Sequence, residues 1–120
     1  MTARFVILHH QVHDGEHWDL MVEQGDVLLT WRLPREPTGA SSLPMPAERI
    51  ADHRKAYLDY EGPLSGNRGE VRQWDRGDYE TIEENESRVV VCLSGSKLSG
   101  RATLEHTGEP AAWTFYFSPD

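Results

Sequence analysis

The chain has little cysteine, little basic charge and no long apolar run. Its single cysteine, Cys92, excludes an internal disulfide, and its place in the apolar run 89–93 favours a buried strand thiol over a nucleophile. The 120 residues include 12 Lys and Arg against 20 Asp and Glu, a formal net charge of −8. Because broad association with nucleic acid needs many cations, this charge argues against that mode, but not against an enzyme that grips one strand end.

No apolar stretch approaches the roughly 20 residues of a membrane span, and the N-terminus lacks the basic and apolar regions of a signal peptide. We therefore expect a cytoplasmic protein with no membrane partner. A chain of this length is expected to form one domain, residues 1–120, which buries roughly two-thirds of its unfolded surface. We expect a monomer.

Short strands separated by turn signals dominate the sequence. The predicted strands are residues 4–10, 17–23, 27–33, 70–74, 88–93, 101–106 and 113–117. The predicted irregular segments are the proline-rich loop 34–46, the loop 62–69, the turn 75–78 and the glutamate-rich loop 80–86, and one short helix is expected between Pro46 and Gly62. This pattern predicts a mainly β fold, a small closed or nearly closed antiparallel β-barrel with one or two short helices.

Four of the six histidines lie within residues 9–17. In the strand that follows, alternation places His17 and Asp19 on one face, together with Met21 and Glu23. The pair Asp14-Gly15 predicts a turn that folds two strands into a hairpin and brings His10 beside His17 and Asp19.

Two neutral imidazoles and one carboxylate suit Mn²⁺, Fe²⁺ or Zn²⁺, and the lack of cysteine argues against a structural zinc site. Mn²⁺ fits best if the substrate is a phosphate. Spacing alone leaves two interpretations open, because His9, His10 and His13 would also suit the surface of a strand end and loop.

Other chemistry-bearing residues have ordinary structural interpretations when they are considered one at a time. His53 and Tyr57, at i,i+4 spacing, would cap and pack the short helix, and Arg35 would be a surface arginine. Trp18, Trp31 and Trp74 are expected in the core, with stacking on a base as the alternative.

Five motifs in order resemble one known family. Residues 17–23 (HWDLMVE) and 27–34 (VLLTWRLP) are similar to the His-aromatic-Asp-x-Arg-x-Glu and Trp-x-x-Pro runs of the 3′-phosphoesterase domain of bacterial DNA ligase D. Residues 52–62 (DHRKAYLDYEG) resemble its Asp-His-Pro-Leu-x-Tyr-x-x-Phe-Glu-Gly. Residues 69–77 (GEVRQWDRG) and 97–101 (KLSGR) resemble its Gly-x-Val-x-x-Trp-Asp-x-Gly and Lys-Leu-x-Gly-x. The matches run from Phe5 to about Phe117.

The resemblance implies a β-barrel that holds Mn²⁺ in a crescent-shaped groove and removes a 3′-terminal phosphate or ribonucleoside from a DNA primer end. The implied partners are the 3′ ends of DNA or DNA/RNA primers and end-joining repair proteins. By motif, the metal ligands would be His10, His17 and Asp19, with the ion neutralising phosphate charge and activating water.

The resemblance also implies roles outside the metal group. His53 falls on the family's phosphate-contacting histidine and would serve as a donor or general acid, and Tyr57 falls on its functional tyrosine. Arg35 stands where the family has a lysine after Trp-x-x-Pro, and its guanidinium would hold a phosphate. Glu23 and His9 are the further expected substrate contacts.

The chain departs from the family pattern at three points. Met21 replaces the arginine two positions after the aspartate, and His10 lies seven rather than six positions before His17, which keeps His9 and His13 as alternative first ligands. Met1 to Arg4 are all that stands before or at the start of the first predicted strand, where the ligase-linked domains carry an N-terminal extension with further functional residues.

Two other functions stay open on the sequence. One is a degenerate phosphoesterase fold that binds DNA ends or a repair partner without turnover. The other is a non-haem iron oxygenase in which His17, Asp19 and the distant His106 form the triad, although no Lys or Arg follows His106 to hold a co-substrate acid.

Overall fold

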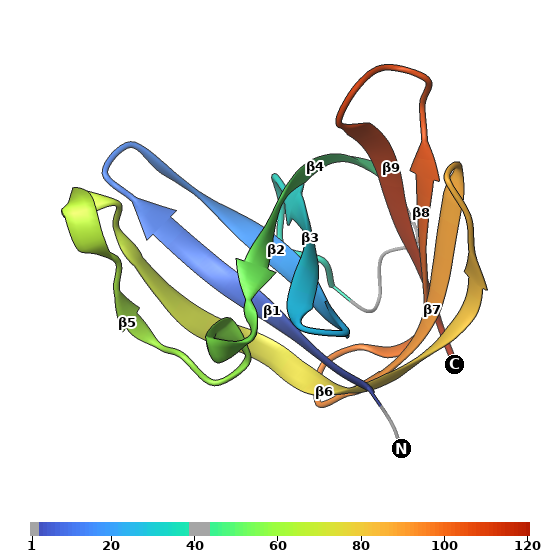
Figure 1. The fold of residues 1–120 in the computed structure, drawn as a ribbon, viewed down its shortest axis with the longest axis horizontal. Helices are drawn as coiled ribbons and strands as arrows, with labels where there is room; N and C mark the ends of the chain where they lie inside the picture. The colour runs from blue at the N-terminus through green and yellow to red at the C-terminus, as the bar shows by residue number, and fades with distance from the viewer. Residues whose placement is uncertain (1–2, 39–43) are drawn as a thin grey trace.

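The computed structural model describes residues 3–38 and 44–120, and within them the chain forms a closed antiparallel barrel (Figure 1). The strands are β1 (Ala3–Val12), β2 (Gly15–Gln24), β3 (Val27–Leu33), β4 (Met45–Arg54), β5 (Gly62–Pro63), β6 (Glu70–Glu84), β7 (Arg88–Gly95), β8 (Ser99–His106) and β9 (Ala112–Pro119). Two short 3-10 helices, η1 (Lys55–Leu58) and η2 (Ser65–Asn67), flank β5. The predicted mainly β barrel is confirmed.

Eight strands make the closed wall, in the order β1-β2-β3-β4-β9-β8-β7-β6, and pairing of β1 with β6 closes it. The two-stranded ladder of β5 with β6 lies outside this ring. No helix in the described part of the chain is long and apolar enough to cross a membrane.

The barrel core is formed by one face of each strand. Phe5 and Ile7 of β1 point into it, and Trp31 and Phe115 are among its largest fully buried side chains. Trp18 and Trp31 are buried as predicted. Trp74 is partly buried against the core and carries Lys97 over its ring, with 4.6 Å from Nζ to the ring centroid.

A second, smaller apolar cluster lies on the other face of the wall. Val6 and Leu8 alternate with the core residues of β1, so they point away from the barrel core, and Met21 and Leu28 join them from β2 and β3. Leu58 of η1 packs on this cluster. The segment after β4 therefore covers the outer face of β1 to β3, and the predicted site residues lie on that face.

Most of the segment between Pro46 and Gly62 is β4, and the short helix predicted there is present only as the 3-10 helix η1. Buried Met45 and Ala47 alternate with exposed Pro46 and Glu48, and this stretch pairs with β9. Although the apolar residues that follow have helical spacing, backbone pairing with β9 and β3 makes most of this segment a strand, and only the 3-10 turn η1 is helical.

The predicted turn 75–78 and most of the loop 80–86 are wrong, since both lie within β6, which runs without a break to Glu84. The first hairpin turns at His13 and Asp14, with Gly15 already in β2. Cys92 is half-buried because it lies on the outer face of β7. Part of the predicted loop 34–46, residues 39–43, lies outside the described residues.

Candidate metal centre

His10, His17 and Asp19 converge on the outer face of the β1–β2 hairpin. His10 and His17 are direct cross-strand partners, and their Nδ1 and Nε2 atoms lie 2.8 Å apart. His17 Nε2 lies 3.5 Å from Asp19 Oδ2, and one ligand atom from each residue falls within 4.8 Å of the other two. His10 and Asp19 are buried, at 9% and 3% exposure. The predicted hairpin therefore brings the three side chains together.

Hydrogen bonding and burial prepare His10 for metal binding. Its Nε2 lies 2.8 Å from the carbonyl oxygen of Arg68, so Nε2–H donates there and the Nδ1 lone pair faces His17. Desolvation by burial lowers the pKa of His10, the Arg68 carbonyl opposes this shift, and the neighbouring His17 adds to it. The neutral imidazole that results is the form that binds metals.

The donor set fits a borderline divalent ion, because it offers two imidazole nitrogens and one carboxylate without a thiolate. Bound there, such an ion would neutralise charge on phosphate oxygens and lower the pKa of a bound water. Asp19 also accepts a hydrogen bond from Arg32, whose Nε lies 3.3 Å from Oδ1, so the two carboxylate oxygens face different partners.

His53 and Tyr57 line the same cavity as His10 and Asp19, a space of about 90 Å³. His53 Nδ1 lies 3.0 Å from the carbonyl oxygen of Ala51 and 3.1 Å from Oγ1 of Thr30. The Tyr57 ring meets the His53 ring edge-on, with centroids 5.5 Å apart. No helix contains both residues, because His53 lies in β4 and Tyr57 in η1, but these two elements place the side chains next to each other.

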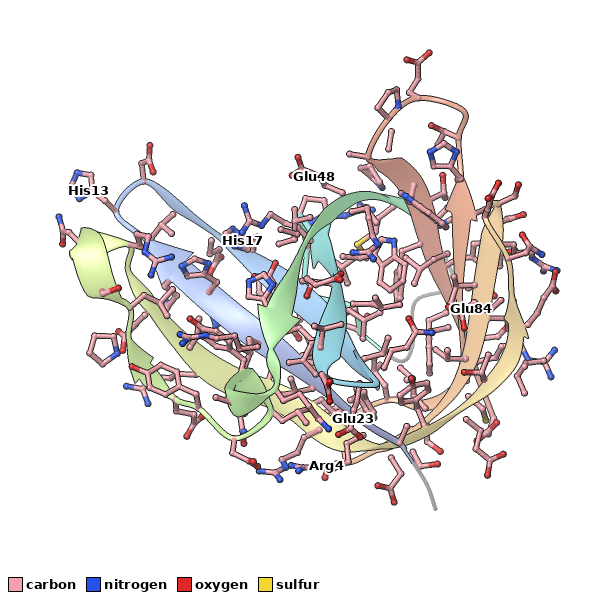
Figure 2. All side chains as sticks on the ribbon, in the orientation of Figure 1. Arg4, His13, His17, Glu23, Glu48 and Glu84 are labelled. Carbon is pink, nitrogen blue, oxygen red and sulfur yellow. The ribbon has the colours of Figure 1, made fainter. Side chains whose placement is uncertain are left out.

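The other histidines of the cluster lie elsewhere. His9, on the opposite face of β1 from His10, stacks on Trp18 with centroids 4.6 Å apart, and its Nε2 lies 2.7 Å from Glu16 Oε1. His13 is exposed at the hairpin tip (Figure 2). Of the three candidates for the first ligand, only His10 belongs to the cluster of possible metal ligands found among the described residues, His10, His17 and Asp19.

Glu23 and Arg35 are placed away from the cavity. Glu23 lies toward the other end of β2, near Arg4 (Figure 2). It pairs with Lys55 at 2.8 Å and accepts the backbone N–H of Arg4 at 3.1 Å; these contacts, the Lys55 bond foremost, lower the pKa of Glu23. Arg35 is exposed, with Nη2 3.4 Å from the carbonyl oxygen of Pro44.

Two arginines that sequence reasoning missed, Arg32 and Arg68, also line the cavity. Arg32 had a signal: the Gly25-Asp26 turn pairs Gln24 with Val27, and the same register pairs Asp19 with Arg32. Arg68 follows η2 in an irregular segment, where no periodicity reports which way a side chain points.

Comparisons with known proteins agree with this geometry. The family model for the DNA Ligase D 3′-phosphoesterase domain matches residues 8–106. The chain is 31% identical over 110 residues to the multifunctional non-homologous end joining proteins LigD of Mycobacterium bovis and Mycobacterium tuberculosis, covering 86% of this chain and 14% of each relative. The LigD protein of Mycolicibacterium smegmatis is 29% identical over 118 residues, covering 87% of this chain and 15% of that relative.

The chain thus corresponds to a small part of the length of these relatives. The match to the family model covers most of the chain, including all the residues that line the cavity. The motifs, the barrel and the family match agree, so the chain belongs to the DNA ligase D 3′-phosphoesterase domain family.

Proposed function

We propose that this protein is a Mn²⁺-dependent phosphoesterase that removes a 3′-phosphate, and also a 3′-ribonucleoside, from DNA ends during double-strand break repair. The convergence of His10, His17 and Asp19 in a chain of this family carries the proposal. Mn²⁺ is the proposed ion because nitrogen and carboxylate donors suit it and the substrate is a phosphate. The LigD relatives are named for non-homologous end joining, which supports DNA 3′ ends as substrate and end-joining proteins as partners.

In this proposal the three ligands hold the ion and His53 acts on the substrate. Because Nδ1 of His53 is engaged by Ala51 and Thr30, its Nε2 is the atom left to exchange a proton with substrate or water. Protonated Nε2 would donate to a phosphate oxygen or to the departing 3′ oxygen. Tyr57 packs edge-on against His53 and would orient that ring, and the family motif gives this tyrosine a functional role as well.

The test is release of phosphate from a 3′-phosphorylated primer in the presence of Mn²⁺. We expect turnover by the wild type and a loss of at least about a hundredfold in His17→Ala, since removal of a ligand disrupts the ion's charge stabilisation. His106→Ala is the matched control, because His106 packs against Trp113 and, among the described residues, is not part of the cluster of possible metal ligands. Absence of release under any divalent ion, or full activity in His17→Ala, would sink the proposal.

One observation favours a second candidate, a DNA-end binding module without turnover. Met21 is 2% exposed in the second apolar cluster, where the family motif has an arginine. Tight binding to 3′-phosphate ends with no turnover under any divalent ion would support this candidate. Placement of His106 against Trp113 gives the oxygenase alternative no support.

A further inference from the structure

The family motif supplies a cation two positions after the aspartate, and this chain has Met21 there. Its side chain packs among Val6, Leu8 and Leu28 on the outer face of the wall. Met21 still borders the cavity that holds His10 and Asp19. The cavity therefore keeps two of the three candidate metal ligands, His10 and Asp19, but receives no positive charge from position 21.

Arg32 brings a positive charge to the same cavity from the neighbouring strand. It is the direct partner of Asp19 across β2 and β3, whereas Met21 is paired with Thr30. Its guanidinium Nε lies 3.3 Å from Asp19 Oδ1, and its side chain is 37% exposed. The arginine thus sits one strand away from the motif position but on the same face.

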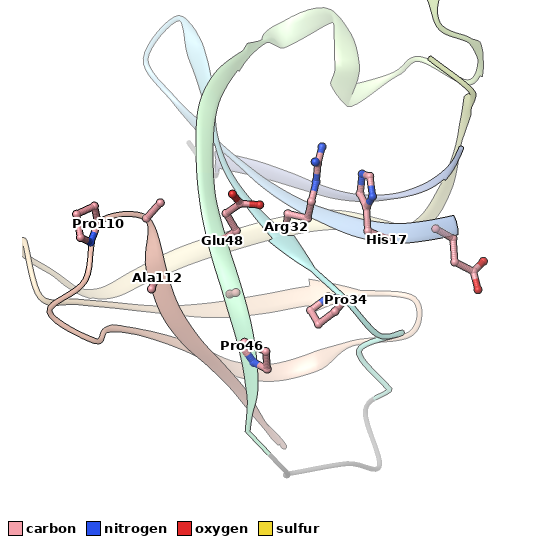
Figure 3. A pocket seen from close by; sticks show the side chains of 10 residues that line it. His17, Arg32, Pro34, Pro46, Glu48, Pro110 and Ala112 are labelled. Carbon is pink, nitrogen blue, oxygen red and sulfur yellow. The ribbon is translucent and has the colours of Figure 1, made fainter. Parts of the chain in front are cut away.

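Arg32 also stands between two hollows of the surface. It lines the 90 Å³ cavity together with His10, and it lines an open groove of about 520 Å³ together with His17 and Pro34. Figure 3 shows Arg32 and His17 side by side, projecting in the same direction from adjacent strands. A group that enters from the groove meets the guanidinium and the imidazole together.

The charges around Arg32 suit an anion beside a metal ion. Asp19 engages Nε, and within residues 3–38 and 44–120 the two terminal nitrogens have no hydrogen-bond partner. Those nitrogens form the part of the guanidinium fork that binds two oxygens of one phosphate. Glu48, the partner of Arg32 across β3 and β4, lines the same groove; its negative charge disfavours an anion there, so the phosphate is expected on the side of the guanidinium that faces His17.

We propose that Arg32 binds the 3′-terminal phosphate and supplies to the cavity the positive charge that the family motif places at position 21. This inference rests on the proposed function for its substrate. It makes Arg32 a substrate-binding residue, and the ion pair with Asp19 holds the guanidinium in place. The relocation explains how the chain tolerates an apolar Met21 at the cavity wall.

The test compares binding of two oligonucleotides that differ only in a 3′-phosphate or 3′-hydroxyl end, measured by fluorescence anisotropy on metal-free protein. We expect the wild type to prefer the phosphate and Arg32→Ala to lose about tenfold of that preference, with Arg32→Lys between them. Arg101→Ala, which removes an exposed arginine from β8, is expected to keep the full preference. Retention of the preference in Arg32→Ala overturns the inference.

Relocation itself is tested by returning the cation to its motif position. Met21→Arg combined with Arg32→Ala is expected to restore the preference, and failure of a folded double variant to do so overturns the inference. If the double variant does not fold, millimolar methylguanidinium is added to Arg32→Ala instead. Restoration of the preference for the 3′-phosphate then supports the inference, and failure to restore it overturns the inference. Mn²⁺ affinity separates phosphate binding from positioning of Asp19. If Arg32 binds the phosphate, Arg32→Ala should leave the Mn²⁺ affinity unchanged and lower the preference for the 3′-phosphate. If Arg32 only positions Asp19, the substitution should change the Mn²⁺ affinity and leave that preference intact.

Turnover distinguishes failure of this inference from failure of the proposed function. If the wild type releases phosphate and Arg32→Ala matches its kcat/KM, the function stands and the inference falls. If no variant turns over but the preference for a 3′-phosphate depends on Arg32, the inference stands and the function falls. We expect wild-type turnover and a loss of about a hundredfold in kcat/KM for Arg32→Ala.

Discussion

A single carboxylate, that of Asp75, holds the turn between β7 and β8. Its Oδ1 accepts the backbone N–H groups of Arg76, Ser96 and Lys97, and its Oδ2 accepts that of Leu98, at 2.8–3.1 Å. Asp75 is 4% exposed, so water cannot readily replace these bonds. The Asp of the Trp-Asp-x-Gly motif is therefore structural here.

Asp75→Ala is expected to lower the free energy of unfolding by about 3 kcal/mol, because it leaves several buried N–H groups without an acceptor. Asp75→Asn, which keeps one carbonyl oxygen, should lose less. Urea denaturation measures both, and Asp78→Ala, an exposed aspartate of the same strand, is the matched control expected to stay within about 0.5 kcal/mol of wild type. Equal stability of Asp75→Ala and Asp78→Ala would contradict this account.

Tyr79 makes stability depend on pH at the alkaline end. Its buried hydroxyl donates to the carbonyl oxygen of Glu23 at 2.5 Å, and burial, with the charges of Glu84 and Glu23, raises the pKa of Tyr79. The folded state therefore keeps a proton that the unfolded chain loses near pH ~10. This contribution is fully present below that pH and is lost as the pH rises through the higher folded-state pKa.

We expect the free energy of unfolding of the wild type to fall more steeply above about pH 10 than that of Tyr79→Phe, which has no phenol to ionise. Urea titrations between pH 8 and 11 measure the two slopes. Tyr116→Phe, which removes a hydroxyl bonded to Glu105 at the surface, should retain the wild-type slope. Identical slopes for wild type and Tyr79→Phe would refute the assignment.

At the scale of elements, Gly77 lets β6 approach β7. A Cβ at this position would lie 2.0 Å from the backbone carbonyl oxygen of Ser94, which no flexible side chain can relieve. Gly77→Ala should therefore lower the free energy of unfolding by about 3 kcal/mol, as the two strands must separate. Gly15→Ala, with open space around its added Cβ, should be close to neutral in the same denaturation series. A stable Gly77→Ala variant would show that the strands are not held this closely.

The strands that could be predicted from sequence are those whose alternation and turns are local. β7, β8 and β9 have such patterns and appear as expected. In β6 the run Asp75 to Asp78 has the composition of a turn, but Asp75 is used to hold another hairpin and Gly77 to allow close packing. Both features are contacts with strands far away in the sequence, so the local sequence around Asp75 and Gly77 does not reveal them.

The part of the site that could be predicted from sequence is the part set by the register of the two hairpins. One short turn places His10 opposite His17, and the next places Arg32 opposite Asp19, although only the first relation was drawn from the sequence. The neighbourhood of His53 and the carbonyl of Arg68 depend on how the segment after β4 folds over the wall. That path is set by Leu58 packing on the second apolar cluster, a long-range contact.

At the scale of the whole molecule, metal binding should stabilise the fold, because an ion held by His10, His17 and Asp19 would bind the folded chain and not the unfolded one. At a Mn²⁺ concentration a hundred times the Kd, the gain is about 2.7 kcal/mol, which corresponds to a rise of about 10 °C in Tm. The His17→Ala variant should show no such rise in a thermal scan, while His106→Ala should behave as wild type. A Tm shift shared by His17→Ala would place the ion elsewhere.

Closure of the barrel joins segments that are far apart in the chain: Ala3 pairs with Tyr79, and Met45 with Phe115. Hairpins such as β1–β2 can form early, but these distant pairings must each pay the entropy of a long loop before any contact rewards it. Refolding should therefore occur in milliseconds to seconds, as for other all-β barrels. Until these two pairings form, β1, β4, β6 and β9 are open edges, so intermolecular strand pairing competes with folding when refolding is attempted at high protein concentration.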